Sequence, residues 1–365
     1  MPVTKDLAPL YIKSLHHDYR VQFHESLFSA CQPLLDIPES VCVIDKRVAS
    51  LHAESLAPLL NSRPTLELDA LESTKTLAGV ETIIDWMLEN GCTRSSTVIA
   101  IGGGIIQDAV TFTSNIYYRG VRFILLPTTL LSMCDSCIGA KCGINHGSFK
   151  NQLGVLHAPH EVHVATPFLD TLDDVDICSG YGEIIKLALT ENDTDIETVF
   201  SAVNEGGTRC PELLTMIRRS LEIKQAVIEE DEYETDLRRI LNYGHTFGHA
   251  LEALTNHAVP HGLGVAWGIT LINELSIQRG HPIEELAAQL RDFITEHFSF
   301  ELDEFPSAEK LIEMTRRDKK VSGGLLNLVL LRGAGDLIID PVPFDDDLLN
   351  GVRRFLDSSN GISRN

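Results

Sequence analysis

Three histidines, His245, His249 and His261, lie within one short segment of the chain. The residues around the first two predict a helix, and side chains four residues apart on a helix share one face. Two imidazoles so placed, with a third shortly beyond, offer the nitrogen ligands of a divalent metal site. Histidines at this spacing are also common as structural residues, so the pattern alone leaves both interpretations open. A helical zinc protease would carry Glu after the first histidine, where Thr246 stands, which argues against a protease.

Glu183 and Lys186 form a second group with possible chemistry, three residues apart in a segment with a helical pattern. On a helix this spacing brings the two side chains to one face, where such pairs usually form surface salt bridges. Their neighbours Ile184, Ile185 and Leu187 are apolar. We therefore expect the pair to be partly buried.

The run Thr97–Ile101 predicts a buried strand that leads directly into Gly102, Gly103 and Gly104. A strand, a glycine cluster and a helix in this order are typical of a phosphate cradle, although they also form ordinary tight turns. We expect Asp108, one turn into the helix, to point back over the glycines. Asp45 ends another apolar run, Val41–Asp45, and could reach a ribose hydroxyl or cap the following helix.

Strands alternate with helices in the first half of the chain, and helices dominate the second half. This pattern predicts an α/β plus α fold, with a Rossmann-like parallel α/β domain over residues 1–176 and a mainly helical domain over residues 177–365. We expect a loop-rich stretch from Asp135 to Asn151, in which Lys141 and Lys150 lie among glycines and could bind an anion. Asp236–Thr255 reads as a single helix.

The composition argues against several classes of binding partner. A formal net charge of −22 argues against a nucleic-acid or anionic-membrane surface, and no apolar run is long enough to span a bilayer. Eight cysteines scattered through the chain, without an export-signal pattern at the N-terminus, predict reduced thiols in a cytoplasmic protein.

Taken together, the motifs resemble those of the sugar phosphate cyclase superfamily, and within it the 3-dehydroquinate synthase family. The resemblance covers nearly the whole chain and is strongest from Ile101 to His261. It rests on these pieces in this order: Gly102–Gly104 with Asp108, Tyr118–Gly120, Pro127–Leu130, Asp135 with Lys141, Lys150–Asn151, Gly182–Glu183 with Lys186, Lys224, Asn242–His249, His261–Gly262 and Asp318–Lys320.

The resemblance implies an NAD-binding first domain and a helical second domain that carries the metal. It implies that a divalent metal, zinc or alternatively cobalt, binds Glu183, His245 and His261, and that His249 serves the substrate phosphate. The residues that it implies for NAD are Asp45, Glu72, Lys75, Gly103, Gly104, Asp108, Thr128, Thr129, Lys150 and Thr171.

The remaining implied site residues handle a sugar phosphate substrate, and one of them, Arg119, would reach it from the second subunit of a homodimer. They are Arg119, Asp135, Lys141, Asn151, Lys186, Lys224, Arg238, Asn242, His249, and one of Lys319 and Lys320. Within this set the resemblance assigns Lys224 and Arg238 to a substrate carboxylate. If Asp236–Thr255 is helical, Arg238 lies on the face of Asn242 and Arg239 points away.

The implied reaction is NAD- and metal-dependent elimination of phosphate from 3-deoxy-D-arabino-heptulosonate 7-phosphate, which closes the ring of 3-dehydroquinate. One alternative is a related cyclase that makes a 2-deoxy-scyllo-inosose or valiolone ring from glucose 6-phosphate or sedoheptulose 7-phosphate. Another is a metal-dependent polyol dehydrogenase, whose neutral substrate would not need Lys141, Lys150 and Lys186. Departures from the family pattern lie beside the implied site, at Gln107, Ala140, Cys142, Leu263 and Trp267.

Overall fold

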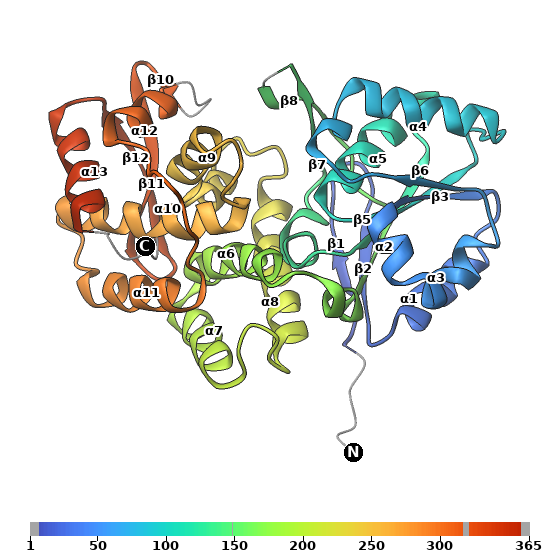
Figure 1. The fold of residues 1–365 in the computed structure, drawn as a ribbon, viewed down its shortest axis with the longest axis horizontal. Helices are drawn as coiled ribbons and strands as arrows, with labels where there is room; N and C mark the ends of the chain where they lie inside the picture. Colours follow the sequence, from blue (N-terminus) through green and yellow to red (C-terminus); the bar gives the residue numbers. More distant parts are fainter. Residues whose placement is uncertain (1–6, 148, 317–320, 359–365) are drawn as a thin grey trace. The chain divides into compact units, whose positions relative to one another are not determined.

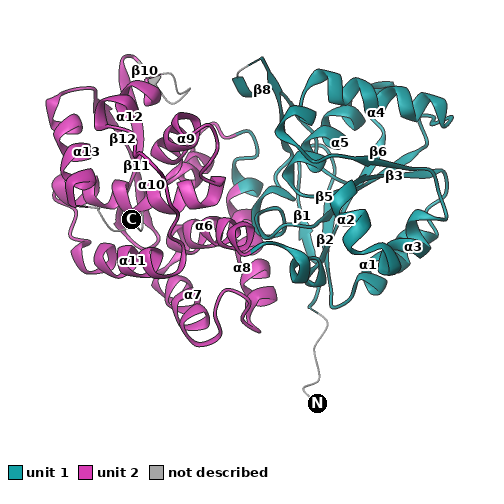
Figure 2. Ribbon diagram, in the orientation of Figure 1, with its two compact units in different colours: residues 1–173, 228–233 teal, residues 174–227, 234–365 magenta. Residues whose placement is uncertain are grey.

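The computed structural model describes residues 7–147, 149–316 and 321–358 (Figure 1). The chain divides into two units: unit 1 comprises residues 1–173 and 228–233, and unit 2 comprises residues 174–227 and 234–365 (Figure 2). The predicted fold class is confirmed, because unit 1 is an α/β unit with a mainly parallel sheet and unit 2 is mainly helical.

Unit 1 is built on a seven-stranded sheet with the order β1-β2-β9-β6-β5-β3-β4. Only β1 runs antiparallel to its neighbour, and every other pairing in this sheet is parallel. The interior strands β3 and β5 are mostly apolar and almost entirely buried, as expected for parallel strands covered on both faces. The strands are β1 (Leu10–Ile12), β2 (Tyr19–His24), β3 (Ser40–Asp45), β4 (Thr65–Leu68), β5 (Thr97–Gly102), β6 (Arg122–Pro127) and β9 (Glu161–Ala165).

Helices pack on this sheet: α5 contacts β3, β5 and β6, and α1 contacts β2 and β9. They are α1 (Leu27–Leu35), α2 (Lys46–Leu51), α3 (Ala53–Leu60), α4 (Leu77–Glu89) and α5 (Gly104–Ile116). Short 3-10 or π turns complete the unit: η1 (Glu72–Thr74), η2 (Tyr117–Arg119), η3 (Ser132–Ser136) and η4 (Thr166–Thr171).

The stretch that we expected to be loop-rich contains a hairpin, which corrects that prediction. Strands β7 (Lys141–His146) and β8 (Phe149–Leu156) pair antiparallel, with a register irregularity between Ile144 and His146. The three glycines in this stretch suggested loops, but Cys142 and Ile144 turn inward and pack against Val80 and Phe112. Tertiary packing therefore decides the structure of this segment over its local composition.

Unit 2 consists of helices around the buried α10, with a small antiparallel sheet of order β10-β11-β12. Every residue of α10 from Gly262 to Asn273 is buried, which explains why the helix is apolar all round. The helices are α6 (Asp174–Glu191), α7 (Asp193–Gly206), α8 (Leu213–Glu230), α9 (His245–Leu254), α10 (His261–Gln278), α11 (Glu284–His297), α12 (Ala308–Thr315) and α13 (Asp346–Ser358). The strands are β10 (Val321–Ser322), β11 (Leu325–Gly333) and β12 (Asp336–Pro343).

The single helix expected over Asp236–Thr255 is wrong. Residues Leu237–Asn242 form the 3-10 helix η5, and α9 begins only at His245. Gly244 separates them with a φ of 77°, a left-handed conformation that glycine adopts without a Cβ penalty. The two histidines predicted to share a helix face are nevertheless both on α9, as expected.

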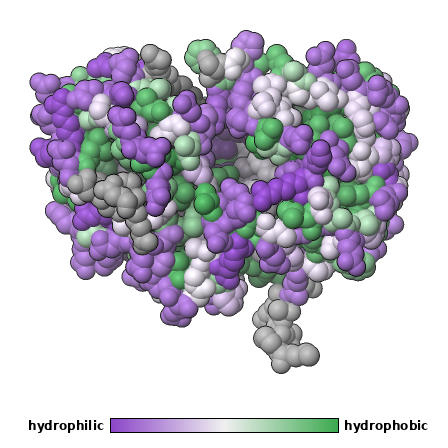
Figure 3. Space-filling model, viewed as in Figure 1, coloured by the Kyte–Doolittle hydropathy of each residue, from purple (hydrophilic) through white to green (hydrophobic). Residues whose placement is uncertain are grey.

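Hydrophilic side chains cover much of the surface drawn in Figure 3, with apolar residues scattered among them. This agrees with the high charge content and the net charge of −22. Over the part of the chain that is described, no helix is both long enough and apolar enough to cross a membrane. All eight cysteines are free thiols, and seven of them are buried.

Candidate functional site

In unit 2, three helices bring together the residues predicted to bind a metal. Glu183 lies on α6, His245 is the first residue of α9, and His261 is the first residue of α10. Glu183 Oε1 lies 3.0 Å from His261 Nε2 and 3.5 Å from His245 Nε2. A carboxylate oxygen thus faces two imidazole nitrogens that come from distant parts of the sequence.

His249 belongs to the same cluster. One ligand atom each from His245, His249 and His261 lies within 4.8 Å of the others. His249 is exposed and His245 is almost buried, so the cluster extends from the interior of unit 2 to its surface. The geometry therefore unites all three histidines singled out in the sequence, together with Glu183.

Close backbone contact between helices makes this convergence possible. A Cβ on Gly182 would lie 1.9 Å from Gly262 O, and a Cβ on Gly262 would lie 1.6 Å from Ser179 O. Only residues without a side chain can occupy this crossing of α6 and α10. Because Gly182 and Gly262 adjoin Glu183 and His261 in sequence, the crossing sets the separation of these two side chains.

Glu183 is fully buried, and its second oxygen forms an ion pair with the buried Lys186. The expected helix pair is confirmed, and its burial is more complete than expected. Burial opposes ionisation of Glu183, but the Lys186 ammonium and then the hydrogen bond with His261 hold the pKa of this carboxyl below its usual value. Glu183 is therefore an anion in the interior, ready to face a cation.

Both imidazoles of the Glu183 contact are oriented through their other ring nitrogen. His245 Nδ1 donates a hydrogen bond to Tyr243 O at 3.2 Å, and His261 Nδ1 donates to Glu252 Oε1 at 2.7 Å. Each ring thus presents Nε2 to Glu183 Oε1, the arrangement in which neutral histidine coordinates a metal. One carboxylate oxygen and inward-facing imidazole nitrogens fit a divalent metal with mixed nitrogen and oxygen ligands.

In unit 1, the glycine cluster forms the turn between β5 and α5. Gly103 is the N-cap of α5, so the turn and the free N–H groups of the first helical turn lie together, as a phosphate cradle requires. Asp108 forms an ion pair with the nearly buried Lys75 at 2.5 Å and accepts a hydrogen bond from Gly143 N at 3.3 Å. Burial raises the pKa of Asp108, and Lys75 opposes that rise.

The family that these sites point to is decided by comparison with known proteins. A model of the 3-dehydroquinate synthase N-terminal domain matches residues 65–179, and one of the C-terminal domain matches residues 180–321. The 3-dehydroquinate synthase of Roseobacter denitrificans is 37% identical over 325 residues, which cover 84% of this chain and 86% of that protein. The chain belongs to the 3-dehydroquinate synthase family. Another relative, the 3-dehydroquinate synthase of Rhodospirillum rubrum, is 38% identical over 83% of this chain and 82% of its own.

Solved structures confirm the fold of this family member. The 2-epi-5-epi-valiolone synthase ValA of Streptomyces hygroscopicus, solved with NAD+ and Zn2+ bound, has a TM-score of 0.83 at 26% identity over 97% of this chain and 99% of its own. A 2-deoxy-scyllo-inosose synthase, solved with carbaglucose-6-phosphate, NAD+ and Co2+, has a TM-score of 0.84 at 22% identity over 95% of this chain and 100% of its own. The glycerol dehydrogenase of Schizosaccharomyces pombe has a TM-score of 0.61 at 14% identity over 92% of this chain and 89% of its own.

These comparisons confirm the resemblance read from the sequence, and with it the enzyme class. The 3-dehydroquinate synthase family comprises carbon–oxygen lyases that act on phosphates, and the chain is such an enzyme. The dehydrogenase alternative shares the layout of the fold at a lower level of similarity. The family assignment does not by itself assign a role to any single site residue.

The remaining unit 2 residues of the predicted site lie on α8 and η5. Lys224 and Arg238 are both buried, whereas Arg239 is exposed. The prediction that Arg238 shares the face of Asn242 is wrong, because η5 is a 3-10 helix with about three residues per turn, in which Arg239 and Asn242 lie on one face. Asn242 Nδ2 donates to Glu234 Oε1 at 2.6 Å, so Glu234 orients this amide.

A polar network in unit 1 joins the predicted NAD residues to the hairpin. Asn145 Nδ2 donates to Glu72 Oε1 at 2.8 Å, and Asn145 Oδ1 accepts from Asn151 N at 3.0 Å. Lys150 Nζ lies 3.7 Å from the same Glu72 oxygen. Sequence reasoning missed Asn145, whose buried amide connects Glu72 with Asn151. It also missed Glu252, a single acid among the apolar residues of α9.

Other predicted residues of unit 1 occupy defined positions. Asp45 caps α2, accepting from Arg47 N at 2.9 Å, so the capping alternative is confirmed. Thr129 Oγ1 donates to Ser132 Oγ at 2.9 Å beside the buried Thr128, and Thr171 Oγ1 lies 2.8 Å from His52 Nε2. Asp135 lies in η3, Lys141 begins β7 and Arg119 ends η2. Lys319 and Lys320 lie outside the described residues.

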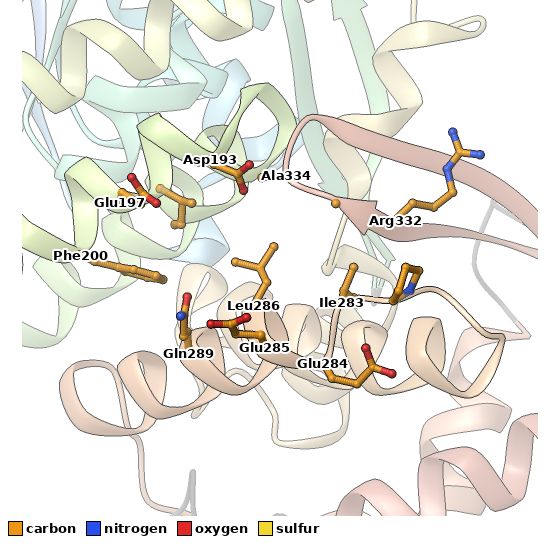
Figure 4. Close-up of a pocket in the computed structure, with 13 residues that line it drawn as sticks. Asp193, Glu197, Phe200, Ile283, Glu284, Glu285, Leu286, Gln289, Arg332 and Ala334 are labelled. Atoms are coloured by element: carbon orange, nitrogen blue, oxygen red, sulfur yellow. The ribbon is translucent and has the colours of Figure 1, made fainter.

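A pocket of about 650 Å³ in unit 2 contains none of the predicted site residues (Figure 4). It is lined by the first turns of α7 and α11 and by the β11–β12 turn. Three of its four acids, Asp193, Glu284 and Glu285, lie in first helical turns, where carboxylates stabilise the helix dipole, and the fourth, Glu197, lies one turn further along α7. Helix stability thus explains three of the four acids of this pocket without a ligand.

Proposed function

We propose that this protein is a 3-dehydroquinate synthase. It would eliminate phosphate from 3-deoxy-D-arabino-heptulosonate 7-phosphate and close the carbon ring, with the aid of NAD and a divalent metal. The observation that carries this proposal is the meeting of Glu183 with His245 and His261, in a chain that is 37% identical to a 3-dehydroquinate synthase. Family membership alone would not show that these three side chains meet in this chain.

In this proposal Glu183, His245 and His261 hold the metal, and the NAD residues are those predicted from the sequence. A bound metal supplies a Lewis acid for neighbouring substrate hydroxyls, and bound NAD supplies a reversible hydride acceptor. The chain's own contribution is to keep the metal ligands in place: Lys186 maintains Glu183 as an anion in the interior. The functional division follows the sequence prediction, with residues 1–176 as the NAD-binding domain and residues 177–365 as the metal-binding domain that also supplies most of the substrate-binding residues.

The phosphate group would be bound by the amides and cations of the predicted set: Lys141, Asn151, Asn242, His249 and one of Lys319 and Lys320. The leaving phosphate can take up the proton itself, so a separate strong base is not required. Arg119 would add a contact from the second subunit. Its exposure supports that role, because an exposed side chain can reach a neighbouring protomer.

The carboxylate of the substrate distinguishes this proposal from the related cyclases. Lys224 and Arg238 would bind it, and both are buried although they are cations. Their elements pack together, since Ile223 and Val227 of α8 share a cluster with Leu241 of η5. Two buried cations on adjacent elements suit a carboxylate ligand, for which glucose 6-phosphate offers no counterpart.

We further propose zinc as the native metal, a homodimer as the assembly and the cytoplasm as the location. Zinc suits a site of two imidazoles and one carboxylate that leaves a position for substrate. Eight free cysteines, seven of them buried, suit a reducing compartment.

The test is a phosphate-release assay with a panel of sugar phosphates, with and without a chelator and NAD. We expect release only from the heptulosonate phosphate, inhibition by the chelator, and no net accumulation of NADH. Lys224→Ala and Arg238→Ala should each lower kcat/KM by about 100-fold. Arg239→Ala, which removes an exposed neighbouring arginine, serves as the matched control and should have little effect.

Two outcomes would contradict the proposal in different ways. Phosphate release from glucose 6-phosphate or sedoheptulose 7-phosphate, but not from the heptulosonate, would establish one of the related cyclases. Stoichiometric formation of NADH from a neutral polyol, without phosphate release, would establish a dehydrogenase.

A further inference from the structure

Glu252 contacts the ring of His261 on the side opposite Glu183. Its Oε1 accepts a hydrogen bond from His261 Nδ1 at 2.7 Å, while His261 Nε2 lies 3.0 Å from Glu183 Oε1. Glu252 is on α9 and His261 is the first residue of α10, so the contact joins two helices. His261 therefore lies between two carboxylates, one on each ring nitrogen.

The burial of Glu252 is costly, which argues against an incidental surface contact. The Glu252 side chain is only 9% exposed, and its Cγ would lie 3.5 Å from a Cβ placed on Gly264 of α10. A carboxylate removed from water to this extent is unfavourable unless it is paired. The other imidazole near it, His257, is more distant, with Nδ1 4.0 Å from Glu252 Oε2. His261 is thus the closer of the two imidazoles by more than an ångström.

The consequence for His261 follows from imidazole chemistry. When Nδ1 keeps its proton in a hydrogen bond to a carboxylate, the Nε2 lone pair is left for a metal and the ring plane is fixed. His245 has the same orientation, but its Nδ1 donates to the neutral carbonyl of Tyr243 at 3.2 Å. The anionic acceptor at His261 gives the shorter bond and makes that ring the stronger electron donor.

We propose that Glu252 is a positioning residue that orients His261 and thereby strengthens divalent-metal binding. Resting on the proposed function, this inference adds a residue that does not itself contact the metal. In this proposal Glu252 acts on the metal through His261. Loss of the Glu252 carboxylate should therefore lower the metal affinity even when no substrate is present.

The experiment measures Zn2+ and Co2+ affinity of the purified full-length protein by competition with a chromogenic chelator, without substrate. Glu252→Gln keeps the volume and a hydrogen-bond acceptor but removes the charge, and Glu252→Ala removes the acceptor. We expect affinity to fall by about 10-fold in Glu252→Gln and about 100-fold in Glu252→Ala. Thermal unfolding of the metal-free variants checks that the fold is kept.

His257→Asn is the matched control, since it removes the other imidazole near Glu252 and asparagine tolerates the positive φ of 64° at this position. It should bind metal like the unaltered protein. Unchanged affinity in both Glu252 variants, with binding abolished in His261→Ala, would overturn the role of Glu252 and leave the metal site intact. Absence of stoichiometric metal binding in the unaltered protein would instead reject the proposed function. If Glu252→Ala does not fold, the metal affinity of Glu252→Gln alone tests the proposed role of Glu252.

Discussion

The two candidate sites of this protein are held together by different interactions. In unit 2 the proposed metal ligands lie at helix starts and on a helix face, and glycine contacts fix the helix spacing. In unit 1 the proposed NAD residues lie on turns, and side-chain hydrogen bonds join those turns to a hairpin. The first arrangement depends on backbone packing and the second on polar side chains.

This difference determines how each site should respond to substitution. A helix crossing without room for a Cβ has no low-energy alternative, because protein interiors are close-packed. A hydrogen bond between turns contributes about 1 kcal/mol and can be replaced in part by water. We therefore expect substitutions at the crossing to affect folding, and substitutions in the polar network to affect mainly ligand binding.

The largest effect is expected at the α6–α10 crossing. Gly262→Ala would place a Cβ 1.6 Å from Ser179 O, a backbone atom that cannot move aside. We expect a loss of stability of about 3 kcal/mol or more, measured by chemical denaturation, together with loss of metal binding. Gly333→Ala is the matched control, since nothing lies within 4 Å of its Cβ position. Equal stability of the two variants would refute the packing argument.

The next effect concerns the buried pair of Glu183 and Lys186. Glu183→Gln removes the carboxylate that pairs with the buried Lys186 ammonium, which should cost about 3 kcal/mol of stability. Adding Lys186→Met also removes the buried ammonium and should restore part of the stability, but not metal binding. Denaturation curves and metal titrations of the two variants separate the effects. Recovery of metal affinity in the double variant would show that Glu183 is not a ligand.

Helix spacing and local motifs made the unit 2 site largely predictable. His245 and His249 lie on one helix, and Glu183 pairs with Lys186, as their spacing indicated. The sequence also predicted the buried runs Val41–Asp45 and Thr97–Ile101, which form β3 and most of β5, and the glycine turn after β5. Helical periodicity and side-chain pairs three or four residues apart involve only neighbouring residues, so both can be recognised directly in the sequence.

What could not be predicted depends on distant partners. Asn145 bonds to Glu72, which lies 73 residues earlier, and no local pattern reveals such a contact. The break at Gly244 was missed because the apolar periodicity continues across it, although the glycine itself was visible. The helix α13 was not foreseen either; it buries four residues, Leu348, Gly351, Val352 and Phe355, against unit 2. In each case tertiary contacts outweigh the local sequence.

A smaller effect is expected from the polar network of unit 1. Asn145→Ala removes the hydrogen bonds to Glu72 Oε1 and from Asn151 N. We expect a loss of about 1–2 kcal/mol in stability and, under the proposed function, weaker NAD binding in a fluorescence titration. Asn90→Ala, at the exposed C-cap of α4, is the control in the same unit and should leave NAD affinity unchanged. If both variants bind NAD alike, the network is structural only.

The smallest effect concerns pH and a group of imidazoles in unit 1 away from both sites. Burial, followed by the charges of His17, Arg122 and His157, lowers the pKa of His160 to about 4. The unfolded chain takes up this proton near pH 6.5, whereas the folded chain takes it up only near pH 4. The contribution of His160 to the free energy of unfolding is therefore complete above pH 6.5 and is lost as the pH falls towards 4. We expect a loss of about 1–2 kcal/mol over this range, since part of the ring is exposed.

Thermal unfolding of His160→Asn between pH 7 and pH 4 tests this expectation. Asparagine can still accept the hydrogen bond that Phe123 N donates to His160 Nδ1, so the variant removes the titrating group while keeping the contact. Its stability should vary less with pH than that of the unaltered protein. His146→Asn replaces an exposed imidazole of the same unit and should leave the pH dependence as it was. An identical pH dependence in His160→Asn and the unaltered protein would mean that the acid sensitivity of unit 1 arises elsewhere, for example at Glu161, whose lowered pKa of about 2 acts only below about pH 4.5.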